Sequence, residues 1–292
     1  MKSKYVIALF FIFFFFILFK DFNKPTYPEK ILLKKFKENA EKKLINDYSF
    51  IAHAGGGYKG KTYTNSYEAV ENSIASGFKF IELDILKTSD NYLIAAHDWK
   101  GLKNECKNLS FKSDNAMTLK EFENCNLEFR KLGHKDISHF FDQHGELKKN
   151  ELYLVTDQIN DYKILNKYFL EHHRLLVEIN SIKDFLFARF NNISIKVFNF
   201  TNARRNIIYV KIFNIKFINI HTAYIDQYKD FLTDYLKSGN VVFAYTSNDV
   251  DFVKKNLNKT VSAFYTDFID LKTLECTEKI KDPISKDPCH TY

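Results

Sequence analysis

The chain has 292 residues, of which 45% are apolar, so it is long enough for one α/β barrel with a sizeable buried core. Nine Gly and four Pro are too few for a disordered or fibrous protein. The net charge of +7 is modest and no basic motif with interleaved aromatic residues occurs, so we expect no nucleic-acid partner.

The first predicted element is an uninterrupted apolar stretch over residues 5–19, preceded by Lys2 and Lys4. Fifteen helical residues span about 22 Å, which is shorter than the ~30 Å hydrocarbon core of a bilayer. No small-residue cleavage site follows, so residues 1–20 are predicted to be an uncleaved signal anchor, lengthened by snorkelling lysines. A cleaved signal peptide, giving a secreted protein, is the alternative. The positive charge ahead of the stretch places the rest of the chain outside the cytoplasm, in a periplasmic or extracellular compartment.

Residues 21–48 are predicted to form a basic linker, most of it a helix over 29–45. Apolar residues recur there every four positions, as at Leu32 and Phe36, and lysines occupy much of the remainder. A cationic segment beside a membrane favours anionic lipid head groups, and the alternative is a solvated helix face.

Four cysteines, Cys106, Cys125, Cys276 and Cys289, show no C-x-x-C spacing, which argues against a thiolate metal site. Outside the cytoplasm they can form two disulfides. The pairs nearest in sequence are 106–125 and 276–289, but all three connectivities remain open.

Residues 49–275 are predicted to form one domain in which short apolar runs alternate with helical segments. The candidate strands are 50–54, 78–86, 92–96, 152–157, 175–179, 195–198, 241–246 and 262–266, with a further β-rich stretch at 207–222. The candidate helices are 66–76, 119–127, 181–190, 225–237 and 249–257. Alternating strands and helices indicate an α/β fold with a parallel sheet, and eight units indicate closure into a (β/α)8 TIM barrel. Residues 276–292 form a C-terminal tail.

Polar residues gather where the predicted strands end. His53 ends the first strand, Glu82 and Asp84 lie on the second, His97 follows the third and Asp157 ends the fourth. Because the carboxyl ends of the strands meet at one end of a TIM barrel, we expect these residues to form one site. Two imidazoles and three carboxylates suit metal-assisted acid–base chemistry. The structural alternatives are hydrogen-bonded histidines and a buried salt bridge at the Glu-x-Asp pair.

Three further carboxylates leave alternatives open. Glu178, on the strand after Asp157, competes with it as a site residue. Asp267 follows the last strand and either contacts the site or closes the barrel, the second being favoured. Asp98 is expected to cap or orient the loop after His97.

The motifs over residues 51–98 resemble those of the glycerophosphodiester phosphodiesterase family, a TIM-barrel family of the PLC-like phosphodiesterase superfamily. The chain has IAHAGGG at 51–57, YTNSYEA at 63–69 and FIELDILKTSDNYLIAAHD at 80–98. These follow the order and spacing of the family's His-Arg-Gly, Pro-Glu-Asn-Thr, Glu-x-Asp and His-Asp motifs. The likeness continues in order through YTSN and YTD near the end, and it is weak over 100–235.

The resemblance implies that His53 and His97 are the catalytic pair, one deprotonating the attacking oxygen and the other protonating the leaving alkoxide. It also implies that Glu82, Asp84 and Asp157 ligate a divalent metal. Oxygen ligands favour Mg²⁺ or Ca²⁺ over Zn²⁺.

Substrate contacts implied by the resemblance fall on Gly55, Asn65, Trp99 and Tyr245. The glycine run can let the backbone approach a phosphate. The structural alternatives are a rim aromatic for Trp99 and a core residue for Tyr245.

The chain departs from the family pattern at three positions. Ala54, Thr64 and Ile159 stand where the family has Arg, Glu and Lys. Lysines that could supply the missing positive charge are Lys59, Lys61 and Lys87.

The sequence therefore predicts a metal-dependent phosphodiesterase that hydrolyses a glycerophosphodiester or a lipid-derived phosphodiester and is held at a membrane by its N-terminal helix. A cyclising phospholipase reaction with the same two histidines is an alternative. A catalytically degraded barrel that serves as a membrane-tethered binding or scaffold protein is the alternative from another class. The substrate, the metal and the oligomeric state are not set by the sequence.

Overall fold

The computed structural model describes residues 24–42, 45–111, 115–141, 152–159, 161–169, 174–201, 203–277 and 289. The predicted anchor, residues 1–20, lies outside these ranges. Among the described residues, no helix combines the length and apolar character that a membrane span requires.

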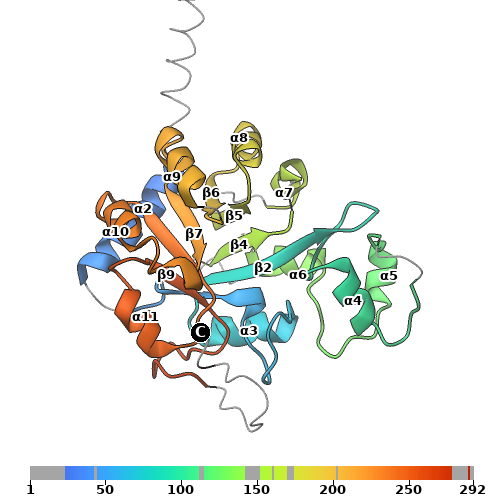
Figure 1. The fold of residues 1–292 in the computed structure, drawn as a ribbon. Helices are drawn as coiled ribbons and strands as arrows, with labels where there is room; N and C mark the ends of the chain where they lie inside the picture. The colour runs from blue at the N-terminus through green and yellow to red at the C-terminus, as the bar shows by residue number, and fades with distance from the viewer. Residues whose placement is uncertain are drawn as a thin grey trace, which may run out of the picture.

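Eight parallel strands close into a barrel, as the sequence predicted (Figure 1). In order around the barrel they are β1 (Phe50–Ala52), β2 (Phe80–Lys87), β4 (Tyr153–Asp157), β5 (Leu175–Ile179), β6 (Ile195–Asn199), β7 (Phe217–His221), β8 (Val241–Tyr245) and β9 (Ala263–Thr266). The first strand closes the barrel because it pairs in parallel with both β2 and β9.

Two strand predictions need correction. The run at 92–96 contains β3 (Leu93–Ala95), but this strand pairs antiparallel with the outer half of β2 and is not part of the barrel. The missing barrel strand is β7, inside the β-rich stretch 207–222. The first part of that stretch belongs to helix α9 (Ala203–Ile212), whose β-branched residues resemble a strand in sequence.

Helices cover the outside of the barrel between successive strands (Figure 1). Besides α9 these are α3 (Tyr67–Ala75), α7 (Tyr162–Tyr168), α8 (Ile182–Phe190), α10 (Lys229–Lys237) and α11 (Val250–Asn256). An excursion between β3 and β4 carries α4 (Trp99–Glu105), α5 (Leu119–Glu123) and α6 (His134–Phe141), and it extends to the right in Figure 1.

Side chains alternate along each barrel strand between the interior and the surrounding helices. On β2, Ile81, Leu83 and Ile85 pack outward with the helices. Phe80 faces inward, and Glu82 and Asp84 share its parity. The interior is therefore apolar where the strands begin and polar where they end.

Helix α2 (Tyr27–Lys42) covers the amino end of the barrel. Leu32 is fully buried, and the ring of Phe36 lies 5.8 Å from that of Phe80 and 5.6 Å from that of Phe243. The helix predicted for the basic linker is therefore packed against the barrel interior, and the opposite end remains for a site.

Both disulfides join the cysteines that are nearest in sequence. Cys106–Cys125 ties the end of α4 to the region after α5, and Cys276–Cys289 ties the tail beside β9. No free cysteine remains.

Candidate active site

Three carboxylates meet at the carboxyl end of the barrel. Glu82 and Asp84 come from β2, and Asp157 ends β4, where the strand register places it opposite Asp84. One oxygen of each lies within 4.8 Å of the others. The grouping predicted from the i, i+2 spacing is thus present in the structure.

Like charges surround each carboxylate of this cluster. Burial raises the pKa of Glu82 well above its usual value, and the nearby charges that raise it further are Asp84, Asp157 and Glu178. Burial, with Glu178 and Asp84 next, raises the pKa of Asp157 to about 9. Three carboxylates this close cannot all ionise without a counter-charge.

One oxygen of the cluster has no hydrogen-bond partner: Asp157 Oδ1 is buried and unsatisfied, while Gln158 donates to Oδ2 at 3.1 Å. An orphaned buried carboxylate oxygen is energetically unfavourable unless a cation or water meets it. The oxygen-only donor set and this unsatisfied atom fit a hard divalent cation such as Mg²⁺ or Ca²⁺.

Glu178 is engaged differently from Asp157, although either could have been the third acid. Its two oxygens accept hydrogen bonds from the Tyr265 hydroxyl and the Asn219 amide. Glu178 is not in the three-carboxylate group. The structure therefore favours Asp157 for that place.

Hydrogen bonds from neighbouring residues orient two of the carboxylates. The Ala54 N–H donates to Glu82 Oε2 at 2.6 Å. Asn65 donates to Asp84 Oδ2 at 2.7 Å and accepts from the Asp84 N–H at 3.0 Å. Asn65, predicted as a substrate contact, is completely buried, and its amide orients the candidate metal ligand Asp84.

His53 stands at the end of β1 and is 9% exposed. Its Nδ1 lies 3.0 Å from Asp267 Oδ1, so the carboxylate accepts the Nδ1 proton and leaves Nε2 for other chemistry. Burial lowers the pKa of His53, but the hydrogen bond and charge of Asp267 together with the charges of Asp84 and Glu178 raise it, and the net pKa is above its usual value.

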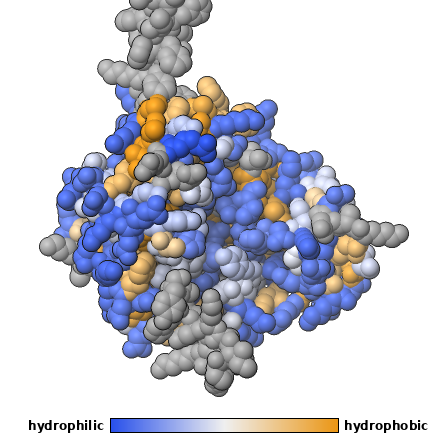
Figure 2. All heavy atoms as spheres, in the orientation of Figure 1, coloured by the Kyte–Doolittle hydropathy of each residue, from blue (hydrophilic) through white to orange (hydrophobic). Residues whose placement is uncertain are grey.

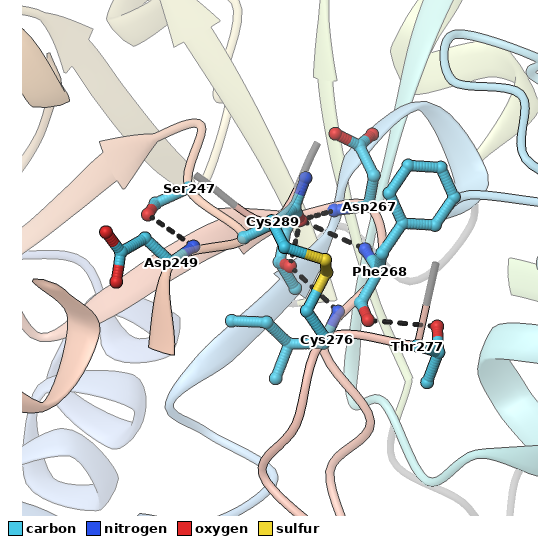
Figure 3. Close-up of a disulfide and its surroundings, with 10 residues drawn as sticks. Ser247, Asp249, Asp267, Phe268, Cys276, Thr277 and Cys289 are labelled. Carbon is cyan, nitrogen blue, oxygen red and sulfur yellow. Dashed lines mark hydrogen bonds between the residues drawn. A yellow bond between two sulfur atoms is a disulfide. The ribbon is translucent and has the colours of Figure 1, made fainter. Parts of the chain in front are cut away.

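Asp267 is the site residue that the sequence interpretation placed wrongly, since it was favoured as a barrel closure. Its backbone N–H and that of Phe268 both donate to Asn248 Oδ1, at 2.8 and 3.0 Å. The Asp267 carboxylate points away from the neighbouring Cys276–Cys289 disulfide (Figure 3). The contact could have been expected from barrel closure, which makes the first and last strands neighbours. In the structure Ala52 of β1 pairs with Thr266 of β9, and the next residues are His53 and Asp267.

His97 follows β3 and therefore belongs to the antiparallel hairpin outside the barrel. Its Nδ1 lies 2.9 Å from Asp98 Oδ2, and half of the side chain is exposed. Asp98 also caps α4 by accepting from the Gly101 N–H, which confirms its predicted structural role. Each histidine is thus held through Nδ1 by an aspartate.

The ring of Tyr63 brings the two histidines into one site. Its centroid lies 4.5 Å from that of His53 and 5.4 Å from that of His97, with both contacts edge-to-face. A cavity of about 430 Å³ opens beside Tyr63 and His97 and includes Glu105 and Lys131. The sequence interpretation assigned Tyr63 no role, because a loop tyrosine carries no pattern.

The other predicted substrate contacts, Gly55, Trp99 and Tyr245, have different surroundings. Gly55 packs against α3, where an added Cβ would come within 3.3 Å of Val70. Trp99 lines a separate 490 Å³ cavity with Gln158. Tyr245 is half-buried and donates to Asn199 at 3.3 Å.

Of the lysines proposed to replace the missing charge, Lys87 is already paired with Asp161 at 2.7 Å. The Lys59 ammonium lies over the Tyr58 ring, 5.3 Å from its centroid. These contacts place neither ammonium against the carboxylates.

Buried carboxylates and two aspartate-held imidazoles at the end of a TIM barrel are groups suited to metal-assisted acid–base chemistry. The model of the glycerophosphoryl diester phosphodiesterase family matches residues 53–271. The chain therefore belongs to this family and is a phosphoric diester hydrolase.

Solved structures of glycerophosphodiester phosphodiesterases share the fold. Those of Parabacteroides distasonis and Thermotoga maritima are 17% and 18% identical to this chain, with TM-scores of 0.58 and 0.53. The alignments cover 76% and 77% of this chain and 93% and 95% of theirs. An Oleispira antarctica phosphodiesterase in complex with the product sn-glycerol-3-phosphate is 16% identical, with a TM-score of 0.53, over 75% of this chain and 92% of that one. No curated protein matches the chain.

Removal of metal is expected to make stability depend on pH through Asp157. Between its usual pKa of 3.8 and about 9, the folded metal-free protein keeps a proton on Asp157 that the unfolded chain releases. Stability of the metal-free protein should therefore fall as the pH rises through this window. Thermal unfolding in EDTA, followed by circular dichroism from roughly pH 5 to roughly pH 8, should show the fall.

The matched variants are Asp157→Asn, which should flatten the profile, and Asp161→Asn, which should not. Asp161 is a suitable control because it is more exposed and its pKa is lowered, mainly by Lys87. Mg²⁺ should raise the unfolding temperature of the native protein more than that of Asp157→Asn. Parallel profiles for the native protein and Asp157→Asn would contradict this account.

Proposed function

We propose that the protein hydrolyses a glycerophosphodiester or a lipid-derived phosphodiester with His53 and His97 as acid–base pair and a divalent metal on Glu82, Asp84 and Asp157. The observation that carries the proposal is the shared contact of Tyr63 with both imidazoles, beside carboxylates surrounded by like charges. It supports one compact site and not two unrelated clusters.

The two imidazoles differ in surroundings, and this difference suggests their roles. His53 is buried, and the charges of Asp84 and Glu178 act on it, so it takes the proton of the attacking oxygen. His97 is half exposed beside the 430 Å³ cavity, so it protonates the departing alkoxide, which leaves through that opening. Asp267 and Asp98 keep Nε2 of each ring available.

A bound divalent metal would supply charge stabilisation at the phosphoryl oxygens. Glu82, Asp84 and Asp157 would hold it, and Asn65 would keep Asp84 in place. Family membership and the acidic cluster both support metal dependence.

Hydrolysis of a panel of phosphodiesters by the purified full-length chain tests the proposal. Glycerophosphodiesters with different head-group alcohols and a lysophospholipid should be compared, with release of the head-group alcohol as the readout common to all of them. The phosphomonoester formed is sn-glycerol 3-phosphate from the former and its acylated form from the lysophospholipid. We expect hydrolysis with Mg²⁺ or Ca²⁺, loss in EDTA and recovery on metal return. Metal-loaded, folded protein that is inactive on every diester would overturn the proposal, and a cyclic phosphate product would favour the cyclising reaction.

The role of His97 as general acid is tested by varying the leaving group. His97→Ala should lower kcat/KM for an alkyl diester by about 10²- to 10⁴-fold. A p-nitrophenyl diester should lose far less, because its phenolate leaves without a proton. His139→Ala, an exposed histidine of the same excursion, is the control and should be neutral on both substrates. Equal losses on the two substrates would contradict the assignment.

The apolar stretch 5–19 is proposed to anchor the protein in a membrane, with the barrel on the extracytoplasmic side. The described chain begins beside α8, because Arg189 donates to the Lys24 carbonyl at 3.0 Å. Apolar side chains gather nearby on α8 and α9, where Phe187 and Ile208 are 51% and 55% exposed (Figure 2). Pairing of all four cysteines also suits an oxidising compartment.

Cell fractionation tests this location. The full-length chain should sediment with membranes, resist extraction by alkaline carbonate and be digested by protease added to intact spheroplasts. Replacement of two residues of the apolar stretch, Phe13 and Phe15, by Asp should release it, because charges near a helix centre oppose insertion. Recovery of the native chain in the cytosolic fraction, protected from protease, would contradict the proposal.

A further inference from the structure

The Tyr63 ring contacts both histidines edge-to-face, and the residue is 48% exposed. One part of the ring lies against the imidazoles, and the rest borders the open cavity. Any phosphorus atom that both histidines serve must therefore lie close to this ring.

The position of Tyr63 is held by the residues that follow it. The Thr64 carbonyl accepts a hydrogen bond from Lys131 Nζ at 2.6 Å, and Lys131 is almost completely buried. The Asn65 N–H donates to the Ala54 carbonyl at 2.9 Å, and the Asn65 side chain is bonded to Asp84. Tyr63 also has a positive φ of 55°, which a freely moving loop residue would rarely keep. Its backbone is thus fixed to the same strand that carries Glu82 and Asp84.

Three of the four backbone N–H groups at residues 54–57 already donate to acceptors within the protein. The Ala54 N–H is taken by Glu82. The Gly56 N–H donates to the His53 carbonyl at 2.7 Å, and the Gly57 N–H donates to the Asp267 carbonyl at 2.8 Å. Ala54 itself is apolar, so it supplies no side-chain donor where the family has an arginine.

The hydroxyl of Tyr63 is a suitable donor in this environment. Burial raises the pKa of the phenol, and Asp267, Asp84 and Glu82 raise it further. The group therefore stays protonated at any physiological pH. An uncharged donor also adds no positive charge that would compete with a metal for the carboxylates.

We propose that the Tyr63 hydroxyl donates a hydrogen bond to a non-bridging phosphoryl oxygen of the substrate and positions the phosphorus between His53 and His97. This inference rests on the proposed function and deepens it, because it assigns phosphoryl recognition to a residue outside the carboxylate and histidine sets. Tyr63 takes the place of the donor that Ala54 cannot provide.

Comparison of Tyr63→Phe with Tyr63→Ala tests the proposal. Tyr63→Phe keeps the ring contacts with both histidines and removes only the hydroxyl. We expect it to lower kcat/KM by about 10²-fold, the usual result of removing one donor to a developing oxyanion. Tyr63→Ala should lose at least as much. Tyr58→Phe, in the same segment but against Phe129, is the matched control and should keep full activity.

Two further measurements separate phosphoryl recognition from a structural effect. Mn²⁺ affinity and the unfolding temperature of Tyr63→Phe should match those of the native protein, while its affinity for sn-glycerol 3-phosphate, measured by calorimetry, should fall about 10-fold or more. Native activity and native product affinity in Tyr63→Phe would overturn the proposal, even if Tyr63→Ala were impaired, since the ring alone would then matter. Altered Mn²⁺ affinity or unfolding temperature would also overturn it.

The binding measurement distinguishes failure of this inference from failure of the proposed function. If the native protein hydrolyses no diester but Tyr63→Phe still binds the phosphomonoester more weakly, the proposed function fails and the phosphoryl contact stands. If the native protein is active and Tyr63→Phe equals it in both assays, the proposed function stands and this inference fails.

Discussion

Alternation of side chains along a closed parallel barrel is the constraint on which this structure depends. Every second residue of each strand must enter an interior that has room only for packed side chains. The chain fills the amino end with residues such as Phe80 and Phe243, under the cover of α2. It fills the carboxyl end with acids. Those acids are buried by the same geometry that buries the rings, so their pKa values are raised and their ionisation would be favoured by a bound cation.

Much of this could be predicted from the sequence, because the strand period and the motif order are local properties. The barrel, the Glu82–Asp84 pair and the strand-end position of Asp157 followed from them. Strand partners are not local. The run at 92–96 is a strand, but apolar residues in a short run do not reveal whether they join a barrel or a hairpin. Helix α9 was not predicted, because its β-branched residues fit the pattern of a strand.

The candidate site shows the same difference between local features, which the sequence reveals, and spatial neighbours, which it does not. Residues on strands were placed correctly, whereas those whose importance comes from a neighbour were missed. Asp267 reaches His53 because β9 lies beside β1, and Tyr63 contacts both His53 and His97 through its ring. The motif spacing predicted that Asn65 belongs to the site, but not that it is completely buried and bonded to Asp84. Motif spacing specifies which residues gather but not which of them face outward.

The two disulfides lie near the two aspartate–histidine pairs and outside the barrel strands. Cys106–Cys125 fastens the excursion that begins at His97 and Asp98, and Cys276–Cys289 fastens the tail next to Asp267. The barrel ladder itself contains neither bridge. Reduction would thus leave the carboxylate cluster on its strands while loosening the supports of both aspartate–histidine pairs. The thiol–disulfide state of the surroundings would then act on the two aspartate–histidine pairs separately from the carboxylate cluster.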